Sequence, residues 1–318
     1  MPDTSLLSLI LTLRPLAAAK DLNALGRASH ALLLDAVRWS DPALAEELHA
    51  GDGLRPFTAS DLIGYSRRQG LSPGQTYTLR FTTLTEPVAR ALAAAAREGP
   101  LRVGASLNLD GTALRIESIS NRGAWIADRS EVYDPQSAIG DPKSDIQHSW
   151  AAATTYEALS APWLLGRAQP ESRLTLCFAS PTTFKSAGRH VPVPLPDLVF
   201  GSLLERWNAF APVALPTEVR RYADECLALG AYRLRTRMVQ VKDGGLRAGA
   251  IGQARYVAIS HDRYWLSLIN LLADFAFYAG VGAGTTTGLG QCRKIADDRS
   301  RDATNPRASI TTTDSGEP

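Results

Sequence analysis

The spacing of apolar residues changes several times along the first 120 residues, and each change predicts a new element of secondary structure. Alternation of apolar and polar residues is typical of a strand, whereas apolar residues three or four positions apart are typical of a helix. The segment Ser40-Asp41-Pro42 predicts the end of one helix and the start of the next, because proline is tolerated in a first helical turn. The predicted elements are strands over residues 6–16 and 76–84, helices over 21–39, 43–49 and 86–98, an extended segment over 55–65, and two strands within 101–116.

The second half repeats this order after a polar segment that has no clear periodicity. The predicted elements are a connecting helix over residues 150–159, strands over 173–179, 232–241, 248–259 and 289–295, and helices over 199–210 and 263–278. Each half therefore has the order β-α-β-β-α-β, which predicts an α+β protein with two tandem ferredoxin-like (RRM-like) domains. Sheets of this type also serve as RNA-binding surfaces.

The same pattern sets the expected domain boundaries. We expect an N-terminal ferredoxin-like domain over residues 1–120, a loop and connecting helix over 121–170, and a C-terminal ferredoxin-like domain over 171–295. Residues 296–318 are polar, of mixed charge and without an apolar face, which predicts a disordered tail.

Composition changes this picture in a few respects. A chain of 318 residues with 45% hydrophobic residues is long enough to bury two cores. The net charge of +2 argues against uniform coating of nucleic acid but allows local arginine clusters, and arginine suits phosphate contacts and base stacking. Three widely spaced cysteines without a Cys-x-x-Cys motif disfavour a disulfide framework or a zinc site, so no metal and no cofactor are expected. No signal peptide and no membrane span are predicted, which favours a soluble, cytoplasmic protein.

Five glycines and three consecutive threonines lie within residues 280–290, which we call the glycine loop. Such a segment is typical of backbone amides that approach an anionic ligand, and a turn that only closes the fold is the alternative. A P-loop would require a lysine, which the glycine loop lacks. A dinucleotide fingerprint would follow a strand and open a helix, whereas here a helix enters the loop and a strand leaves it.

His49 is the first candidate for acid–base chemistry among the five histidines. It lies at a junction between a predicted helix and a loop, with Arg55 a few residues later. An imidazole that moves a proton and a guanidinium that stabilises phosphate charge suffice for RNA cleavage by the ribose 2′-hydroxyl. The alternative is a histidine that only interacts with the helix dipole. His30, one turn after Arg27, is either a packing residue or part of the same site.

Basic residues form three further groups that suit contact with a nucleic acid. Arginines at alternate positions of a predicted strand point to one face, which fits either a phosphate track or a solvated surface. A Pro-Thr-Thr-Phe turn followed by basic residues suits backbone contact. The residues are Arg67 and Arg68 after the extended segment, Lys185 and Arg189 around a Ser-Ala-Gly loop, and Arg233, Arg235 and Arg237 on the strand.

Three segments together resemble the CRISPR-associated endoribonucleases of the RAMP superfamily, which process precursor CRISPR RNA. Residues 278–291, YAGVGAGTTTGLGQ, resemble the glycine-rich signature of that family. DPALAEELH at 41–49, followed by RPFT at 55–58, is similar to its N-terminal block. LTLCFASPTTFK at 174–185 and VFGSLLERW at 199–207 resemble the start of its second domain. The resemblance covers nearly the whole chain in the right order.

The resemblance implies two ferredoxin-like domains and metal-independent cleavage of CRISPR repeat RNA, leaving a 5′-hydroxyl and a 2′,3′-cyclic or 3′ phosphate. His49 matches a histidine that often serves as general acid or base in the family. Arg55 stands where some members have lysine, and Leu34 where some have tyrosine, so Arg27 or His30 could replace that missing group. The implied RNA-binding positions of the glycine loop are Gly280, Gly282, Gly284, Thr285, Thr286, Thr287, Gly288 and Gly290, which would shape the groove between the domains.

Two other functions remain open at this level. A non-catalytic subunit that holds repeat RNA in a CRISPR effector complex would share the fold and the basic surface. A nucleotide-binding enzyme is disfavoured by the missing lysine and by the order of elements around the glycine loop. CRISPR repeat RNA is the expected partner, and other effector subunits and a homodimer are further partners that the sequence leaves open.

Overall fold

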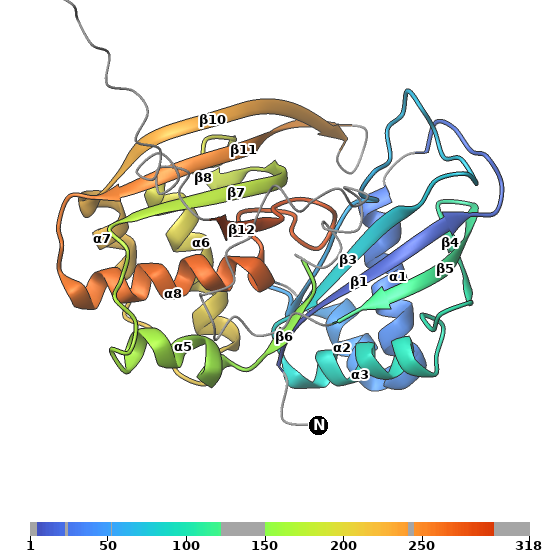
Figure 1. Ribbon diagram of the computed structural model, residues 1–318, viewed down its shortest axis with the longest axis horizontal. Coiled ribbons are helices and arrows are strands. Elements are labelled where there is room, and N and C mark those ends of the chain that lie inside the picture. Colours follow the sequence, from blue (N-terminus) through green and yellow to red (C-terminus); the bar gives the residue numbers. More distant parts are fainter. Residues whose placement is uncertain (1–4, 23–24, 52, 122–149, 241–244, 296–318) are drawn as a thin grey trace, which may run out of the picture.

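The computed structural model describes residues 5–22, 25–51, 53–121, 150–240 and 245–295. Residues 122–149 of the predicted loop and the predicted tail lie outside this described part. In Figure 1 the two halves lie side by side, with helices below each sheet and the glycine loop, coloured red, between them.

The N-terminal half is an antiparallel sheet whose helices pack on one face. Its strand order is β2-β3-β1-β5-β4, with β6 paired to β1. β1 therefore lies between β3 and β5, as the first strand of a ferredoxin-like fold does. The elements are β1 (Leu6–Pro15), α1 (Leu25–Ser40), α2 (Pro42–Ala50), β2 (Phe57–Ala59), β3 (Tyr77–Thr83), α3 (Glu86–Arg97), β4 (Ser106–Leu109), β5 (Thr112–Ser120) and β6 (Ala152–Thr154).

The C-terminal half has the same arrangement in a four-stranded sheet. The order is β10-β11-β7-β12, so the first strand of the unit, β7, again lies in the middle. The elements are α5 (Tyr156–Leu164), β7 (Arg173–Thr182), β8 (Phe184–Ser186), β9 (Arg189–Val191), α6 (Pro196–Phe210), α7 (Val219–Cys226), β10 (Leu227–Gln240), β11 (Leu246–Ala258), α8 (Arg263–Ala279) and β12 (Cys292–Ile295). This confirms the predicted tandem ferredoxin-like fold.

The prediction was wrong in the segment that connects the two halves. Residues 152–154 form strand β6 on the first sheet instead of the start of a helix. The helix begins only at Tyr156, because the Thr155 hydroxyl caps it by accepting from the Ala158 amide at 3.1 Å. The β8–β9 hairpin and α7 were not predicted.

Buried side chains tie the two halves together. The hydrophobic core of the C-terminal half also includes Leu6 and Leu84 of the N-terminal half. Thr82 donates from its hydroxyl to the carbonyl of Tyr278 at 2.6 Å, and Tyr156 donates to the carbonyl of Leu84 at 3.0 Å. Because these groups are buried, separating the halves would leave polar atoms unpaired, which fixes the relative position of the two sheets.

Candidate active site and nucleic-acid interface

The glycine loop needs glycine where other backbone segments cross it closely. A Cβ on Gly282 would lie 2.4 Å from the Thr183 carbonyl oxygen, and one on Gly290 would lie 2.2 Å from that of Val281. Both residues also have positive φ, at 78° and 69°, a conformation that side chains disfavour. The glycine loop therefore packs tightly against β7 and β8.

Most backbone amides of the glycine loop donate to the protein itself. The amide of Ala283 donates to Thr183 at 2.8 Å, that of Gly288 to Ala59 at 2.9 Å, and that of Gly290 to Pro181 at 3.1 Å. The interpretation of this loop as a set of amides directed at an anion is therefore wrong at these positions. Any RNA contact made here would use its carbonyl and threonine groups.

Two residues that sequence reasoning missed hold the glycine loop in place. Arg206 of α6 is buried and donates to the Gly282 carbonyl at 2.6 Å, and burial lowers its pKa to about 10. Gly26 of α1 lies so close that a Cβ there would be 2.2 Å from the Thr287 carbonyl oxygen. The available signals were an arginine in the apolar sequence of α6 and a glycine inside a predicted helix.

His30 faces the glycine loop from α1. Its Nδ1 lies 3.3 Å from the carbonyl oxygen of Thr286, and its ring packs 5.4 Å from that of Phe57. Burial is the main cause that lowers the pKa of His30, and the charges of Arg55 and His49 lower it further against the opposing effect of the Thr286 carbonyl. A carbonyl only accepts, so Nδ1 carries the proton and the neutral ring leaves Nε2 as a free acceptor.

His49 lies exposed in the last turn of α2, close enough to His30 to affect its titration. Asp41 caps this helix by accepting from the Leu44 amide at 3.0 Å, which sets where the helix begins. Arg55 donates to the His49 carbonyl at 3.4 Å. The structure thus brings three of the four candidate catalytic residues, His30, His49 and Arg55, to one place beside the glycine loop.

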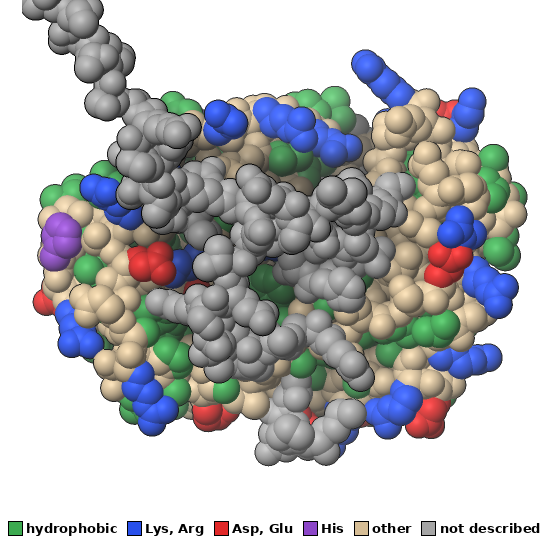
Figure 2. All heavy atoms as spheres, in the orientation of Figure 1, with side chains coloured by type: hydrophobic (Ala, Val, Ile, Leu, Met, Phe, Trp, Pro, Cys, Tyr) green, Lys and Arg blue, Asp and Glu red, His purple; other side chains and the backbone are tan. Residues whose placement is uncertain are grey.

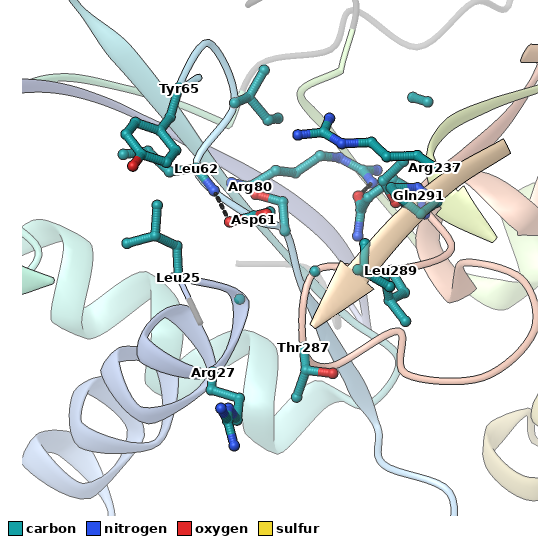
Figure 3. Close-up of a pocket in the computed structure, with 18 of the residues that line it drawn as sticks. Leu25, Arg27, Asp61, Leu62, Tyr65, Arg80, Arg237, Thr287, Leu289 and Gln291 are labelled. Atoms are coloured by element: carbon teal, nitrogen blue, oxygen red, sulfur yellow. Dashed lines mark hydrogen bonds between the residues drawn. The ribbon is translucent and has the colours of Figure 1, made fainter. Parts of the chain in front are cut away.

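The fourth candidate, Arg27, lies on the other side of the glycine loop. It lines a cavity of about 970 Å3 between the two halves, which we call the central cavity (Figure 3). The loop separates the two places, because the Thr286 carbonyl faces His30 whereas Thr287 lines the central cavity. The charged residues of its described lining are one carboxylate, Asp61, and five arginines, Arg27, Arg67, Arg80, Arg237 and Arg247.

The predicted RNA-binding arginines fall around this cavity. Arg67 and Arg237 line it, and Arg67 reaches across to donate to Gln240 of β10 at 3.2 Å, whereas the neighbouring Arg68 is exposed outside the lining. Figure 2 shows Lys and Arg side chains along β10 and β11. β10 is the edge strand of its sheet, and its arginine side chains are exposed: Arg233, Arg235 and Arg237.

The β8–β9 hairpin forms a second basic group. Lys185 lies opposite His190 in the register, Arg189 lies opposite Ser186, and all three basic side chains are exposed. Partial burial is the main cause that lowers the pKa of His190, and the charges of Arg247 and Lys185 lower it further. Arg247 of β11 therefore lies close enough to the hairpin for its charge to act on His190.

Comparisons with known proteins agree with this fold. Residues 176–292 match the family model of the CRISPR-associated endoribonuclease Cas6. Two Cas6 proteins solved as product complexes are each 26% identical to this chain, with TM-scores of 0.69 and 0.68. The matches cover 92% and 91% of this chain and 99% and 100% of theirs. The C-terminal half of the chain thus matches the family model, and nearly the whole chain is similar in fold to Cas6 endoribonucleases.

Further Cas6 structures share the fold. Thermus thermophilus Cas6 is 24% identical to this chain, with a TM-score of 0.64. The match covers 92% of this chain and 99% of that protein. A Cas6-related protein of Pyrococcus furiosus is 12% identical at the same coverage, with a TM-score of 0.55. No match was found among curated proteins. Within the described residues, no helix has the length and apolar character needed to cross a membrane.

Proposed function

We propose that this protein is an endoribonuclease that cuts CRISPR repeat RNA into guide RNAs without a metal ion. The observation that carries the proposal is the grouping of His30, His49 and Arg55 beside the glycine loop. The match of residues 176–292 to the Cas6 family model supports it. So do the similar Cas6 structures, which include a product complex and a substrate-mimic complex.

In the proposed reaction, Nε2 of His30 takes the proton of the ribose 2′-hydroxyl while its oxygen attacks phosphorus. The new P–O2′ bond forms as the P–O5′ bond breaks, and His49 gives a proton to the departing 5′ oxygen. Arg55 stabilises the charge on the non-bridging phosphate oxygens. The products are a 2′,3′-cyclic phosphate and a 5′-hydroxyl, with no change in oxidation state.

The roles follow from what each side chain can do. His30 is suited to the role of base, because the contact with Thr286 fixes its tautomer and its lowered pKa keeps the ring neutral near pH 7. His49 is exposed at a helix end, where a leaving group can reach it. The arginines of β10 and the β8–β9 hairpin would hold phosphates on either side of the cut.

The test is incubation of the purified protein with labelled repeat RNA in EDTA. We expect cleavage at one position within the repeat and products with a cyclic phosphate. Binding of the repeat without any cut would instead support a non-catalytic subunit of an effector complex. Cleavage that stops in EDTA and returns with a divalent ion would contradict the metal-independent step.

A further inference from the structure

The central cavity combines apolar and charged side chains in its lining. Its walls include the apolar side chains of Leu22, Leu25, Leu62 and Leu289, all of which are buried. A cavity of about 970 Å3 is within the range of ligand sites and exceeds the size of one nucleotide. The glycine loop lies between this cavity and the site formed by His30, His49 and Arg55.

A buried cation lies at the floor of the central cavity. Arg80 is 1% exposed and donates to Ser8, Gln291 and the carbonyl of Phe277, all of them neutral groups. Its guanidinium also stacks on the ring of Trp150, 4.7 Å from the centroid. Burial lowers the pKa of Arg80 to about 9, so it is still charged at neutral pH. The floor thus attracts an anionic ligand.

Asp61 is the one carboxylate of the described lining, among five arginines. Its Oδ1 accepts from the amide of Leu62 at 2.8 Å, and the positive charges of Arg237 and Arg67 favour its charged form. The Cβ atom of Asp61 is 3.1 Å from the place that a Cβ on Gly288 would take, so the glycine loop packs directly against it. In Figure 3 Asp61 lies between Leu62 and Tyr65 on one side and Arg237 and Gln291 on the other.

A carboxylate weakens a site that binds only phosphate, because it repels the anion. It is useful when the ligand also carries N–H donors, as a base does on its Watson–Crick edge. Guanine presents two adjacent donors there, N1–H and the N2 amine, which match the two oxygens of a carboxylate. Adenine and cytosine present an acceptor beside their amine, and uracil presents one N–H between two carbonyls.

We propose that the central cavity binds one unpaired guanine, with Asp61 accepting from N1–H and N2–H and the arginines at its mouth holding the adjoining phosphate. This inference rests on the proposed function, since the guanine is taken to be a nucleotide of the repeat RNA. The same chemistry would suit a free guanine nucleotide, so the experiment has to separate the two sources.

The first measurement is the affinity of the full-length protein for 5′-GMP, IMP, AMP, CMP and UMP. IMP differs from GMP only by the missing N2 amine. We expect GMP to bind roughly tenfold more tightly than IMP, because each missing hydrogen bond in such a site costs about a factor of ten. Equal binding of all five nucleotides, or no binding at millimolar concentration, would overturn the proposal.

The second measurement repeats the series with Asp61→Asn, which keeps the shape and replaces one acceptor with a donor. The preference for GMP should disappear, while Asp35→Asn, which removes an exposed charge on α1 outside the cavity, should keep it. Thermal unfolding of both variants checks that they are folded. Preserved selectivity in Asp61→Asn would exclude the assigned role of this carboxylate.

The third measurement is competition, in which GMP is added to protein with bound repeat RNA. Release of RNA by GMP but not by IMP supports a guanine of the RNA in the cavity. GMP binding that leaves RNA affinity unchanged overturns the proposal that the guanine belongs to the repeat RNA. A protein that selects GMP but never cuts repeat RNA would contradict the proposed function and leave the guanine site standing.

Discussion

The imidazole of His30 lies 3.3 Å from the carbonyl oxygen of Thr286, although 256 positions separate the two residues in the chain. The glycine loop therefore does more than shape a surface, because it orients a candidate catalytic side chain. It does so with a carbonyl, while most of its amides serve the packing of the loop itself.

Loss of either imidazole should remove cleavage. We expect His30→Ala and His49→Ala each to slow cutting of repeat RNA about 10²- to 10⁴-fold, the usual effect of a general acid or base. RNA affinity should change only a few-fold. His261→Ala, an exposed histidine before α8, is the matched control and should cut normally. Full activity of both site variants in EDTA would exclude the proposed chemistry.

The pH dependence of cleavage should report on His30. A base is active when deprotonated, and the pKa of His30 is lowered from 6.5, so the acidic limb of the pH–rate profile should have its midpoint below that value. Arg55→Ala removes a positive charge that lowers this pKa, so the rise should move to higher pH. The pH–rate profile of Arg68→Ala provides the control. An unmoved profile in Arg55→Ala would argue against His30 as the base.

Gly26→Ala should destabilise the protein although the residue lies in a helix. Alanine in place of glycine normally stabilises a helix by about 0.5–1 kcal/mol. Here the added Cβ would lie 2.2 Å from the Thr287 carbonyl oxygen, and such overpacking costs about 1–3 kcal/mol. Denaturant unfolding measures the difference. Gly74→Ala, where the nearest atom is 3.6 Å away, is the control, and equal stability of the two variants would contradict the close approach.

Arg206→Met should weaken the attachment of the glycine loop to α6. The variant leaves the Gly282 carbonyl without its donor, and an unsatisfied buried acceptor costs about 1–3 kcal/mol of unfolding free energy. Cleavage should fall as well, since Thr286 lies in the same loop. Arg220→Met removes an exposed arginine that pairs with Glu205 at 3.6 Å, and it should change stability little. A larger loss of stability in Arg220→Met than in Arg206→Met would contradict this assignment.

Replacement of Arg233, Arg235 and Arg237 by alanine should weaken RNA binding in a salt-dependent way. For each phosphate that the variant no longer neutralises, the slope of log affinity against log salt should fall by roughly 0.7 to 0.9. Titrations at several salt concentrations measure the slope. Arg90→Ala, on α3, is the control because this arginine pairs with Glu86 on its own helix, away from β10. An unchanged slope in the triple variant would remove β10 from the RNA path.

Local pattern was enough for most of the elements and for the fold class. Alternation predicted β1, β3 and β7, helical spacing predicted α1, α3 and α8, and the Asp41-Pro42 start predicted α2. These elements depend on neighbours within a few residues, so the sequence determines them directly. The connecting segment shows the limit, because residues 152–154 become a strand through pairing with β1, a partner distant in the chain.

The sequence by itself determined that this chain is a tandem ferredoxin-like protein with a glycine loop and candidate histidines near its N-terminus. Only the tertiary structure decided that His30, His49 and Arg55 share one place and that Arg27 belongs to the central cavity instead. It also decided that the amides of the glycine loop are mostly occupied. The physical reason is distance along the chain, since α1 and the glycine loop meet only after both sheets have formed and their halves have packed together.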